Sequence, residues 1–329
     1  MATARRIIVT GATGAIGRPL CTALAACGYE VVVFTRDPRT ARRSIPEASD
    51  VVAWDPLDAR ATRGWVRAVD SAYGVVHLAG APVFGPRWSR GRKNEIYRSR
   101  VLSTWMLAAA MAEARNRPTV FISSSAVGFY GFRDDTPLGE DAAPGTDFLA
   151  QVCRDWEAAT RRAAEAGIRT ILLRSGIVLD SRAGPLPEMI RPFRFGVGGP
   201  ILPGTQWVPW IHIADEIGLI TWALENSEVY GPLNAVAPEP VTNWTLSHAI
   251  GQTMRSPAWL PIPGLLLRLL FGEFATTVTC GQRAVPAKAL ALGYSFHYPT
   301  LEPALQHLLR PPLSFYSLRE PTARSARSC

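Results

Sequence analysis

The sequence predicts an α/β fold in which a doubly wound parallel sheet is followed by a smaller C-terminal cap domain. A glycine-rich turn joins two apolar runs near the N-terminus, in the pattern of a β-α-β unit. Strand-like and helix-like segments then alternate up to about residue 182, which favours a parallel sheet with right-handed crossovers. Beyond residue 183 proline and glycine crowd together, so we expect the chain to leave the sheet there.

The first β-α-β unit contains a candidate phosphate-binding turn. Ile7–Val9 predicts a strand, a helix follows to about Gly28, and Glu30–Phe34 predicts the second strand. Glycines between strand and helix permit a sharp turn and close approach of a pyrophosphate, whose charge the free N–H groups of the helix start bind. The turn therefore predicts a bound dinucleotide, held by Gly11, Thr13, Gly14, Ala15, Ile16 and Gly17.

The later elements follow in chain order. Further strands of the sheet are predicted at Asp50–Trp54, Gly74–Leu78, Thr119–Ser123 and Thr170–Arg174. We expect the chain to return to the sheet for Val208–Ile213, a helix at Asp215–Glu225 and a strand at Leu233–Val236. The cap is expected to hold helices near Trp244–Thr253 and Pro263–Phe271, with the apolar run Leu265–Phe271 buried.

Three parts of the chain result from this division. The dinucleotide-binding domain is predicted at 1–182 with a return at 207–236, and the cap at 183–310. The tail 311–329 is rich in Pro, Ser and Arg and is expected to be disordered.

The composition excludes several classes of function. The 329 residues carry a net charge of +8, but the 33 arginines are scattered among acids and no basic run interleaves with aromatic residues, so we expect no nucleic-acid partner. The five cysteines form no C-x-x-C pair, and we predict neither a disulfide framework nor a metal site. Without a predicted leader or membrane span, we expect a cytoplasmic protein with no membrane partner.

The end of the second strand indicates NADP rather than NAD as the cofactor. NAD-binding proteins usually place an acidic residue there to bind the ribose hydroxyls, whereas this chain has Arg36 after Thr35. A guanidinium at this position would bind a 2′-phosphate through paired, charge-assisted hydrogen bonds. The alternative is that Arg36 pairs with Asp37 or Asp55 on the surface.

Several segments, in the right order over residues 5–310, resemble the extended short-chain dehydrogenase/reductase superfamily, and within it an atypical subgroup called epimerase family proteins. The resemblance is carried by Gly11-x-x-Gly14-x-x-Gly17, Leu78-Ala79-Gly80, Ser123-Ser124-Ser125-Ala126 and Trp210-Ile211-His212-Ile213. Gly281-Gln282-Arg283-x-Val285-Pro286 is similar to a C-terminal domain of unknown function in that subgroup. The resemblance implies a Rossmann domain whose cofactor is also lined by Asp55, Leu78, Ala79 and Gly80.

The catalytic pair of the wider superfamily is missing. There a Lys four residues after a Tyr lowers the pKa of the phenol that transfers the proton. Counting back from Glu157 places Leu149 at the Tyr position and Cys153 at the Lys position, and no Tyr-x-x-x-Lys occurs anywhere in the chain. Arg100 also stands where many relatives carry an asparagine.

Two hydroxyl groups are the candidate catalytic groups that remain. The resemblance places Ser125 beside the nicotinamide, where it would hydrogen-bond a carbonyl oxygen; the alternative is that it caps the next turn. Tyr130 is the nearest phenol along the chain, and it either donates a proton or packs against the cap.

Other polar residues near the cap have simpler interpretations. We expect His212 to be a structural histidine on a strand and Asp215 to cap the following helix. Arg191 and Arg194 either bind an anionic substrate or lie solvated on the surface.

The predicted function is an NADP-dependent oxidoreductase or epimerase-like enzyme acting on an unidentified small molecule. A non-catalytic NADP-binding protein with a regulatory or redox-sensing role is the alternative. An ordinary nucleotide-sugar epimerase is disfavoured by the missing Tyr–Lys pair. Relatives often pair through helices that flank the sheet, so the resemblance makes a homodimer one candidate assembly.

Overall fold

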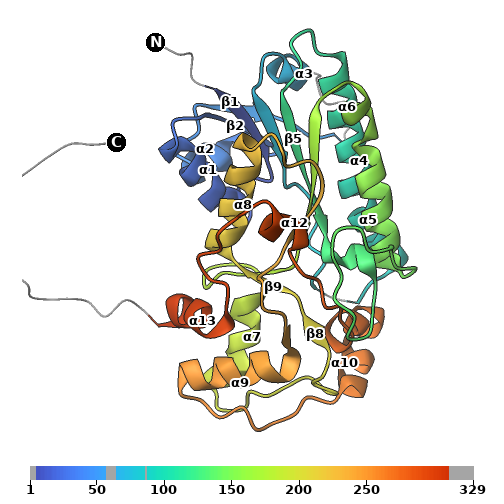
Figure 1. The fold of residues 1–329 in the computed structure, drawn as a ribbon, viewed down its shortest axis with the longest axis vertical. Coiled ribbons are helices and arrows are strands. Elements are labelled where there is room, and N and C mark those ends of the chain that lie inside the picture. Colours follow the sequence, from blue (N-terminus) through green and yellow to red (C-terminus); the bar gives the residue numbers. More distant parts are fainter. Residues whose placement is uncertain (1–4, 57–63, 86, 311–329) are drawn as a thin grey trace, which may run out of the picture.

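A seven-stranded parallel sheet forms the larger part of the molecule. The computed structural model describes residues 5–56, 64–85 and 87–310. The strands lie in the order β10-β6-β5-β4-β1-β2-β3 (Figure 1). Their bounds are β1 Arg6–Thr10, β2 Glu30–Thr35, β3 Asp50–Ala53, β4 Gly74–His77, β5 Val120–Ala126, β6 Arg169–Ser175 and β10 Gly231–Ala235. The doubly wound parallel sheet predicted from the sequence is confirmed.

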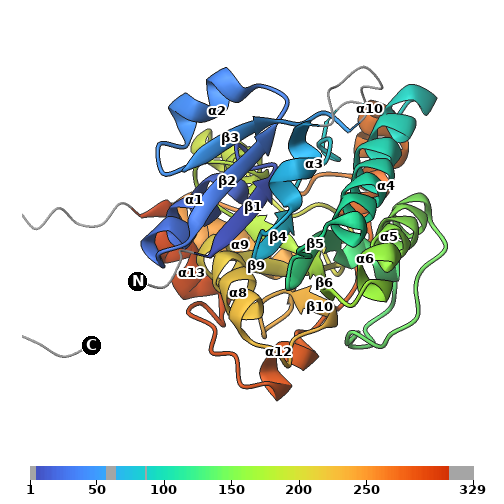
Figure 2. The ribbon, with the colours of Figure 1, turned by 90° about the horizontal axis from the view of Figure 1, so that it is seen from above.

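Helices cover both faces of this sheet, as seen from above in Figure 2. Alternating strand residues separate into two cores: Ile7 and Val9 join one, whereas Ile8 joins the other. This separation follows from the period of two in a strand. The first core is closed by α1 Gly17–Ala26, α2 Pro38–Ser44, α8 Ile213–Glu225 and α12 Ala287–Ala291. The second is closed by α3 Gly64–Val69, α4 Arg90–Glu113 and α6 Arg161–Glu165, with α5 Phe148–Ala159 beside α4.

The cap has its own apolar core and lies below the sheet in Figure 1. Its helices are α7 Pro185–Arg194, α9 Asn243–Met254, α10 Gly264–Phe271, α11 Thr276–Thr279 and α13 Leu301–Leu309. Its short strands are β7 Ile177–Leu179, β8 Trp207–Val208, β9 Trp210–His212 and β11 Val241–Thr242. Two single 3-10 turns complete the described elements: η1 Val127–Tyr130 after β5 and η2 Gly272–Ala275 after α10.

Two expectations for the cap region differ from the structure. The run Val208–Ile213 does not join the main sheet: it is split at Pro209 into β8 and β9, which pair with β11 and β7. The following α8 and β10 do return to the sheet region. The apolar helix α10 is not buried; none of its residues is, and Leu265 and Leu269 are 71% and 67% exposed.

Three further expectations concern the C-terminal tail, membrane spans and metal sites. The predicted disordered tail, 311–329, lies outside the described residues. Within the described ranges, no helix is both long and apolar enough to cross a membrane. The same ranges hold no group of three or more His, Cys, Asp or Glu side chains arranged to bind a metal ion.

Candidate functional site

The carboxyl ends of five neighbouring strands bring the predicted site residues to one edge of the sheet. Gly11 follows β1, Arg36 follows β2, Asp55 lies two residues after β3, and Leu78 follows β4. Ser125 is the second-last residue of β5. Because parallel strands end at the same edge, residues that are far apart in sequence meet there, as expected for a ligand site in an open α/β sheet.

The glycine turn cannot accept side chains at two of its positions. Gly11 has a φ of +67°, and a Cβ on it would lie 2.8 Å from the backbone of Leu78 and Ala79. A Cβ on Gly17 would overlap the carbonyl oxygen of Gly11 and the backbone of Ala12. The turn is therefore packed directly against the Leu78–Ala79 segment, and the two predicted cofactor-binding segments form one surface.

The start of helix α1 offers free N–H groups. Its N-cap, Ile16, makes no side-chain capping bond. No hydrogen-bond partner for the amides of Ala15 and Ile16 is found within the described ranges, and Thr13 and Gly14 are exposed. Uncapped amides at a helix N-terminus, behind a turn with glycine at positions 11, 14 and 17, suit a pyrophosphate. These residues fit the dinucleotide that the sequence predicts.

A buried histidine holds the segment after β4. The Thr10 hydroxyl lies 2.7 Å from Nδ1 of His77 and accepts a hydrogen bond from the amide of Ala79. Burial, together with the nearby Arg100 guanidinium, lowers the pKa of His77 to about 3, so its ring is neutral at ordinary pH. Through Thr10 this histidine positions the loop that is predicted to line the cofactor, and sequence reasoning did not identify it.

Arg100 takes a structural place on α4 behind the same loop. Its Nη1 donates to the carbonyl oxygens of Ala81 and Ile96, and its guanidinium lies over the ring of Trp156. The guanidinium carbon is 3.2 Å from where a Cβ on Gly80 would stand. Glycine at position 80 therefore makes room for this arginine. Burial lowers the pKa of Arg100 to about 10, which leaves it charged at neutral pH.

Arg36 is exposed at the end of β2. Asp37 does not pair with it, because that carboxylate caps α2 by accepting hydrogen bonds from the amide and hydroxyl of Thr40. No ion pair of Arg36 is found in the part of the chain that the structure describes. Asp55 lies at the same edge, since Thr35 is paired with Ala53 across β2 and β3. Arg36 is thus available to a ligand.

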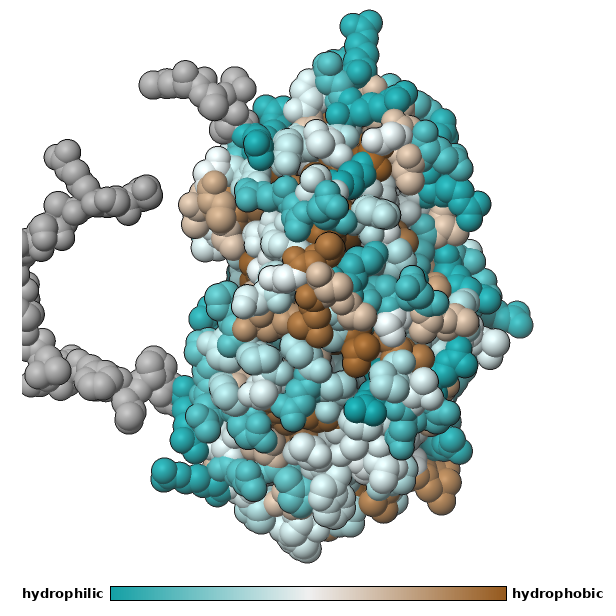
Figure 3. Space-filling view, in the orientation of Figure 1, coloured by the Kyte–Doolittle hydropathy of each residue, from teal (hydrophilic) through white to brown (hydrophobic). Residues whose placement is uncertain are grey.

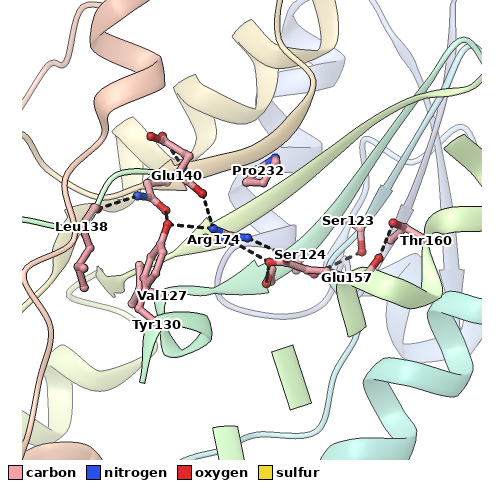
Figure 4. Close-up of polar contacts among 12 residues, drawn as sticks. Ser123, Ser124, Val127, Tyr130, Leu138, Glu140, Glu157, Thr160, Arg174 and Pro232 are labelled. Atoms are coloured by element: carbon pink, nitrogen blue, oxygen red, sulfur yellow. Dashed lines mark hydrogen bonds and ion pairs between the residues drawn. The ribbon is translucent and has the colours of Figure 1, made fainter. Parts of the chain in front are cut away.

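Ser125 belongs to a buried ionic network. Its hydroxyl donates to Glu157 over 2.7 Å, and the same carboxylate accepts two hydrogen bonds from Arg174, at 2.8 and 2.9 Å (Figure 4). The side chains of Arg174 and Glu157 are only 3% and 9% exposed. Ser125 therefore supports the Arg174–Glu157 pair rather than capping a turn, and its donor is engaged.

Tyr130 lies deeper in the same network and is fully buried. Its hydroxyl donates to Oδ1 of Asn234 and accepts from Arg174, whose Nη1 also donates to the carbonyl oxygen of Glu140 (Figure 4). Burial raises the pKa of Tyr130, although the charge of Arg174 and the hydrogen bonds that Tyr130 makes with Arg174 and Asn234 oppose that shift. A buried phenol with a raised pKa is a poor proton donor to a substrate. This geometry argues against the predicted catalytic role of Tyr130.

The two positions expected for the catalytic pair hold apolar or inert groups. Leu149 and Cys153 lie one turn apart on α5 and face η1, close to Gly128. Burial, followed by the charge of Glu157, raises the pKa of the Cys153 thiol to about 12. Neither residue supplies an acid or a base, so α5 contributes packing at this point.

Residues near the cap have structural roles. The prediction that Asp215 caps α8 is wrong. Its carboxylate accepts hydrogen bonds from the amides of His297 and Tyr298, which connects the C-terminal segment to α8. His212 caps that helix instead, through Nδ1, and burial lowers its pKa to about 4. Arg191 and Arg194 are exposed on α7.

A pocket of about 890 Å³ is lined by residues other than those of the glycine turn. It lies between residues 132–143, 203–207 and 280–281. None of the predicted cofactor-binding residues lines it. It is bounded on one side by the loop that follows Tyr130 and on the other by cap segments, so it borders the predicted substrate side of the molecule.

Comparison with known proteins agrees with this architecture. Residues 7–235 match the NAD-dependent epimerase/dehydratase family, and residues 262–308 match a domain of unknown function. The Arabidopsis thaliana epimerase family protein SDR39U1 homolog, chloroplastic, is 37% identical over 92% of this chain and 86% of its own length.

Two solved structures are also similar. The crystal structure of human epimerase family protein SDR39U1 (isoform 2) with NADPH is 34% identical with a TM-score of 0.82, covering 92% of this chain and 98% of that one. A Bacillus cereus UDP-glucuronic acid 4-epimerase in complex with UDP-glucuronic acid and NAD has a TM-score of 0.74 at 20% identity, over 92% and 97% of the two chains. That second likeness concerns the fold alone.

Proposed function

Because this chain belongs to the NAD-dependent epimerase/dehydratase family, we propose that it is an NADP-dependent oxidoreductase acting on a small molecule. The proposal rests on two features at one edge of the sheet: a helix start that follows the glycine turn and has no side-chain cap, and Arg36 at the end of β2, which has no ion pair within the described ranges. The human relative described with NADPH supports the same cofactor.

The residues proposed to bind the cofactor form two groups, one at the phosphates and one nearer the centre of the sheet. The amides of Ala15 and Ile16 would bind the pyrophosphate, and Arg36 would bind the 2′-phosphate. Leu78–Gly80 and Ser125 stand at the ends of β4 and β5, nearer the centre of the sheet. When bound, NADPH supplies a hydride; the protein positions the acceptor and excludes water.

Cofactor preference provides the first test. The NADPH and NADH affinities of the protein are measured by calorimetric titration, for the wild type and for Arg36→Ala. Charge-assisted hydrogen bonds contribute about 1.5–3 kcal/mol, so we expect NADPH to bind roughly 10- to 100-fold more tightly and Arg36→Ala to erase most of that difference. Arg115→Ala is the matched control: it follows α4, at the opposite edge of the sheet, and should change neither affinity. Equal wild-type affinities for the two cofactors would refute the assignment.

Catalysis must proceed without a Lys-activated Tyr. Ser125 is the polar side chain at the expected reaction site, and its hydroxyl is oriented by Glu157. To polarise a carbonyl oxygen it would exchange that hydrogen bond for one to the substrate. NADPH oxidation against a broad panel of carbonyl compounds tests this role: an active substrate should lose at least ten-fold in turnover with Ser125→Ala, with NADPH affinity unchanged.

A second candidate function rests on the same network. Ser125 and Tyr130 both have their hydroxyl donors engaged inside the protein, and Leu149 and Cys153 carry no usable proton. These observations favour a non-catalytic NADP-binding protein with a regulatory role. The two candidates separate cleanly: tight NADPH binding with no oxidation by any compound of the panel supports the binding protein and contradicts the oxidoreductase.

A further inference from the structure

The cap carries an apolar surface formed by two segments, residues 195–202 and 259–271. Of the eighteen large apolar side chains that are exposed among the described residues, ten lie on these segments. The most exposed are Phe195, Trp259, Leu265 and Leu269. Soluble monomers rarely expose so many large apolar groups together, and such patches mark interaction sites.

The two segments form one continuous surface. Nε1 of Trp259 donates to the carbonyl oxygen of Gly196, and the amide of Leu260 donates to the carbonyl oxygen of Gly198. Further along, the amide of Leu202 donates to the carbonyl oxygen of Ile262, two residues before α10 begins. The exposed leucines of the helix therefore continue the patch that begins at Phe195.

Helix α10 presents its leucines on one side. Leu265, Leu266, Leu269 and Leu270 have the spacing i, i+1, i+4 and i+5, which places them on a single stripe. All four are exposed, whereas Leu267 is half-buried. Figure 3 shows brown side chains at the lower right of the molecule, where Figure 1 places α10.

Arginines accompany the apolar side chains of these two segments. The stretches 189–202 and 255–272 contain no acidic residue and four arginines, all exposed: Arg191, Arg194, Arg255 and Arg268. Within the described residues only Arg191 has an ion-pair partner, Glu188, at 4.0 Å. The acid that follows α10, Glu273, is paired with Lys93. The two segments and the residues next to them in sequence thus combine exposed apolar side chains with exposed arginines.

We propose that this surface docks the protein on an anionic phospholipid bilayer. Leucine and tryptophan side chains insert at the headgroup boundary, while arginines bind anionic headgroups. The proposal concerns the face of a peripheral protein and differs from the sequence expectation of no membrane partner.

The charge distribution disfavours a second copy of the chain as the occupant. A twofold dimer would place the same patch on both sides of the interface. Arg194, Arg255 and Arg268, which have no ion-pair partner among the described residues, would then be brought close to the same arginines of the second copy, which is unfavourable. An anionic bilayer supplies the missing negative charge.

Vesicle flotation with the full chain tests the proposal. We expect the protein to bind vesicles of phosphatidylcholine with phosphatidylserine and to bind vesicles of phosphatidylcholine alone more weakly. The difference in binding between the two kinds of vesicle should decrease as the salt concentration is raised. The double variant Leu269→Ser/Leu270→Ser should bind anionic vesicles at least ten-fold more weakly. Because both leucines are already exposed, this variant should keep the wild-type thermal midpoint.

The matched control is Leu290→Ser/Leu292→Ser, which alters two exposed leucines outside the surface and should bind vesicles like the wild type. Equal binding by the Leu269/Leu270 variant and the wild type would overturn the proposal. Absence of wild-type binding to the anionic vesicles would overturn it as well. If ultracentrifugation then shows a dimer that the Leu269/Leu270 variant dissociates, the surface is assigned to self-association.

Discussion

Replacing Glu157 by Gln should destabilise the protein more than any surface charge substitution. The substitution keeps the shape of the side chain but removes the charge that two guanidinium bonds from Arg174 require. Arg174 is only 3% exposed, so its charge would remain buried and uncompensated. Breaking a buried pair in this way costs about 3–5 kcal/mol.

The control is an ion pair of the same type on the surface. Arg162 and Glu113 are 2.8 Å apart, with side chains 46% and 67% exposed, so Glu113→Gln should cost at most about 1 kcal/mol. Urea unfolding, followed by tryptophan fluorescence, compares the midpoints of the two variants with the wild type. Combining Glu157→Gln with Arg174→Met should recover part of the loss, because no buried charge remains.

One result would refute this reasoning. If Glu157→Gln and Glu113→Gln shift the urea midpoint equally, by no more than the surface pair predicts, the network is not a stabilising element. The stabilising role assigned to the hydrogen bonds of Ser125 and Tyr130 would then be contradicted.

Three further outcomes are expected. Gly17→Ala should lower the urea midpoint and reduce NADPH affinity at least ten-fold, because its Cβ overlaps the turn backbone, whereas Gly64→Ala, with open space around it, should do neither. Burial raises the pKa of Glu216 from 4.5 to about 7, so the folded state holds this proton more tightly than the unfolded chain; stability should therefore fall as pH rises from 4.5 to 7. Glu216→Gln should remove that decrease and stabilise the protein at pH 8 by roughly 3 kcal/mol, measured as the pH dependence of urea unfolding. Purified protein should show at most a few-thousandth of the UDP-glucose epimerisation of an ordinary epimerase, since positioned acid–base catalysis contributes about 10²–10⁴-fold; a coupled assay for the 4-epimer checks this.

The main sheet could be predicted because its signals are local. Apolar runs such as Ile7–Val9 and the alternation of strands with helices specify a parallel sheet without knowledge of distant contacts. The phosphate turn could be predicted for the same reason, since a glycine with positive φ between a strand and a helix has few other uses. Arg36 is predicted to bind the 2′-phosphate from its position alone, directly after β2.

The roles of buried polar residues could not be predicted, because they depend on partners distant in sequence. Tyr130 was a candidate proton donor until its contact with Asn234, 104 residues away, showed where its hydroxyl points. Asp215 looked like a helix cap, but its carboxylate binds amides 82 and 83 residues later. Glu157 served only to locate the missing catalytic pair, and no local pattern indicated that Arg174 would hold it.

The sequence alone determined which predicted site residues stand at the carboxyl end of each strand. They are a phosphate turn after β1, an arginine at the end of β2, and a serine at β5 without a Tyr–Lys pair after it. Burial was decided only by the tertiary structure. Hydrophobicity predicted that Leu265–Phe271 would be inside, yet α10 lies on the surface. Whether an apolar run is covered depends on which element packs on it, and that choice is made by the whole chain.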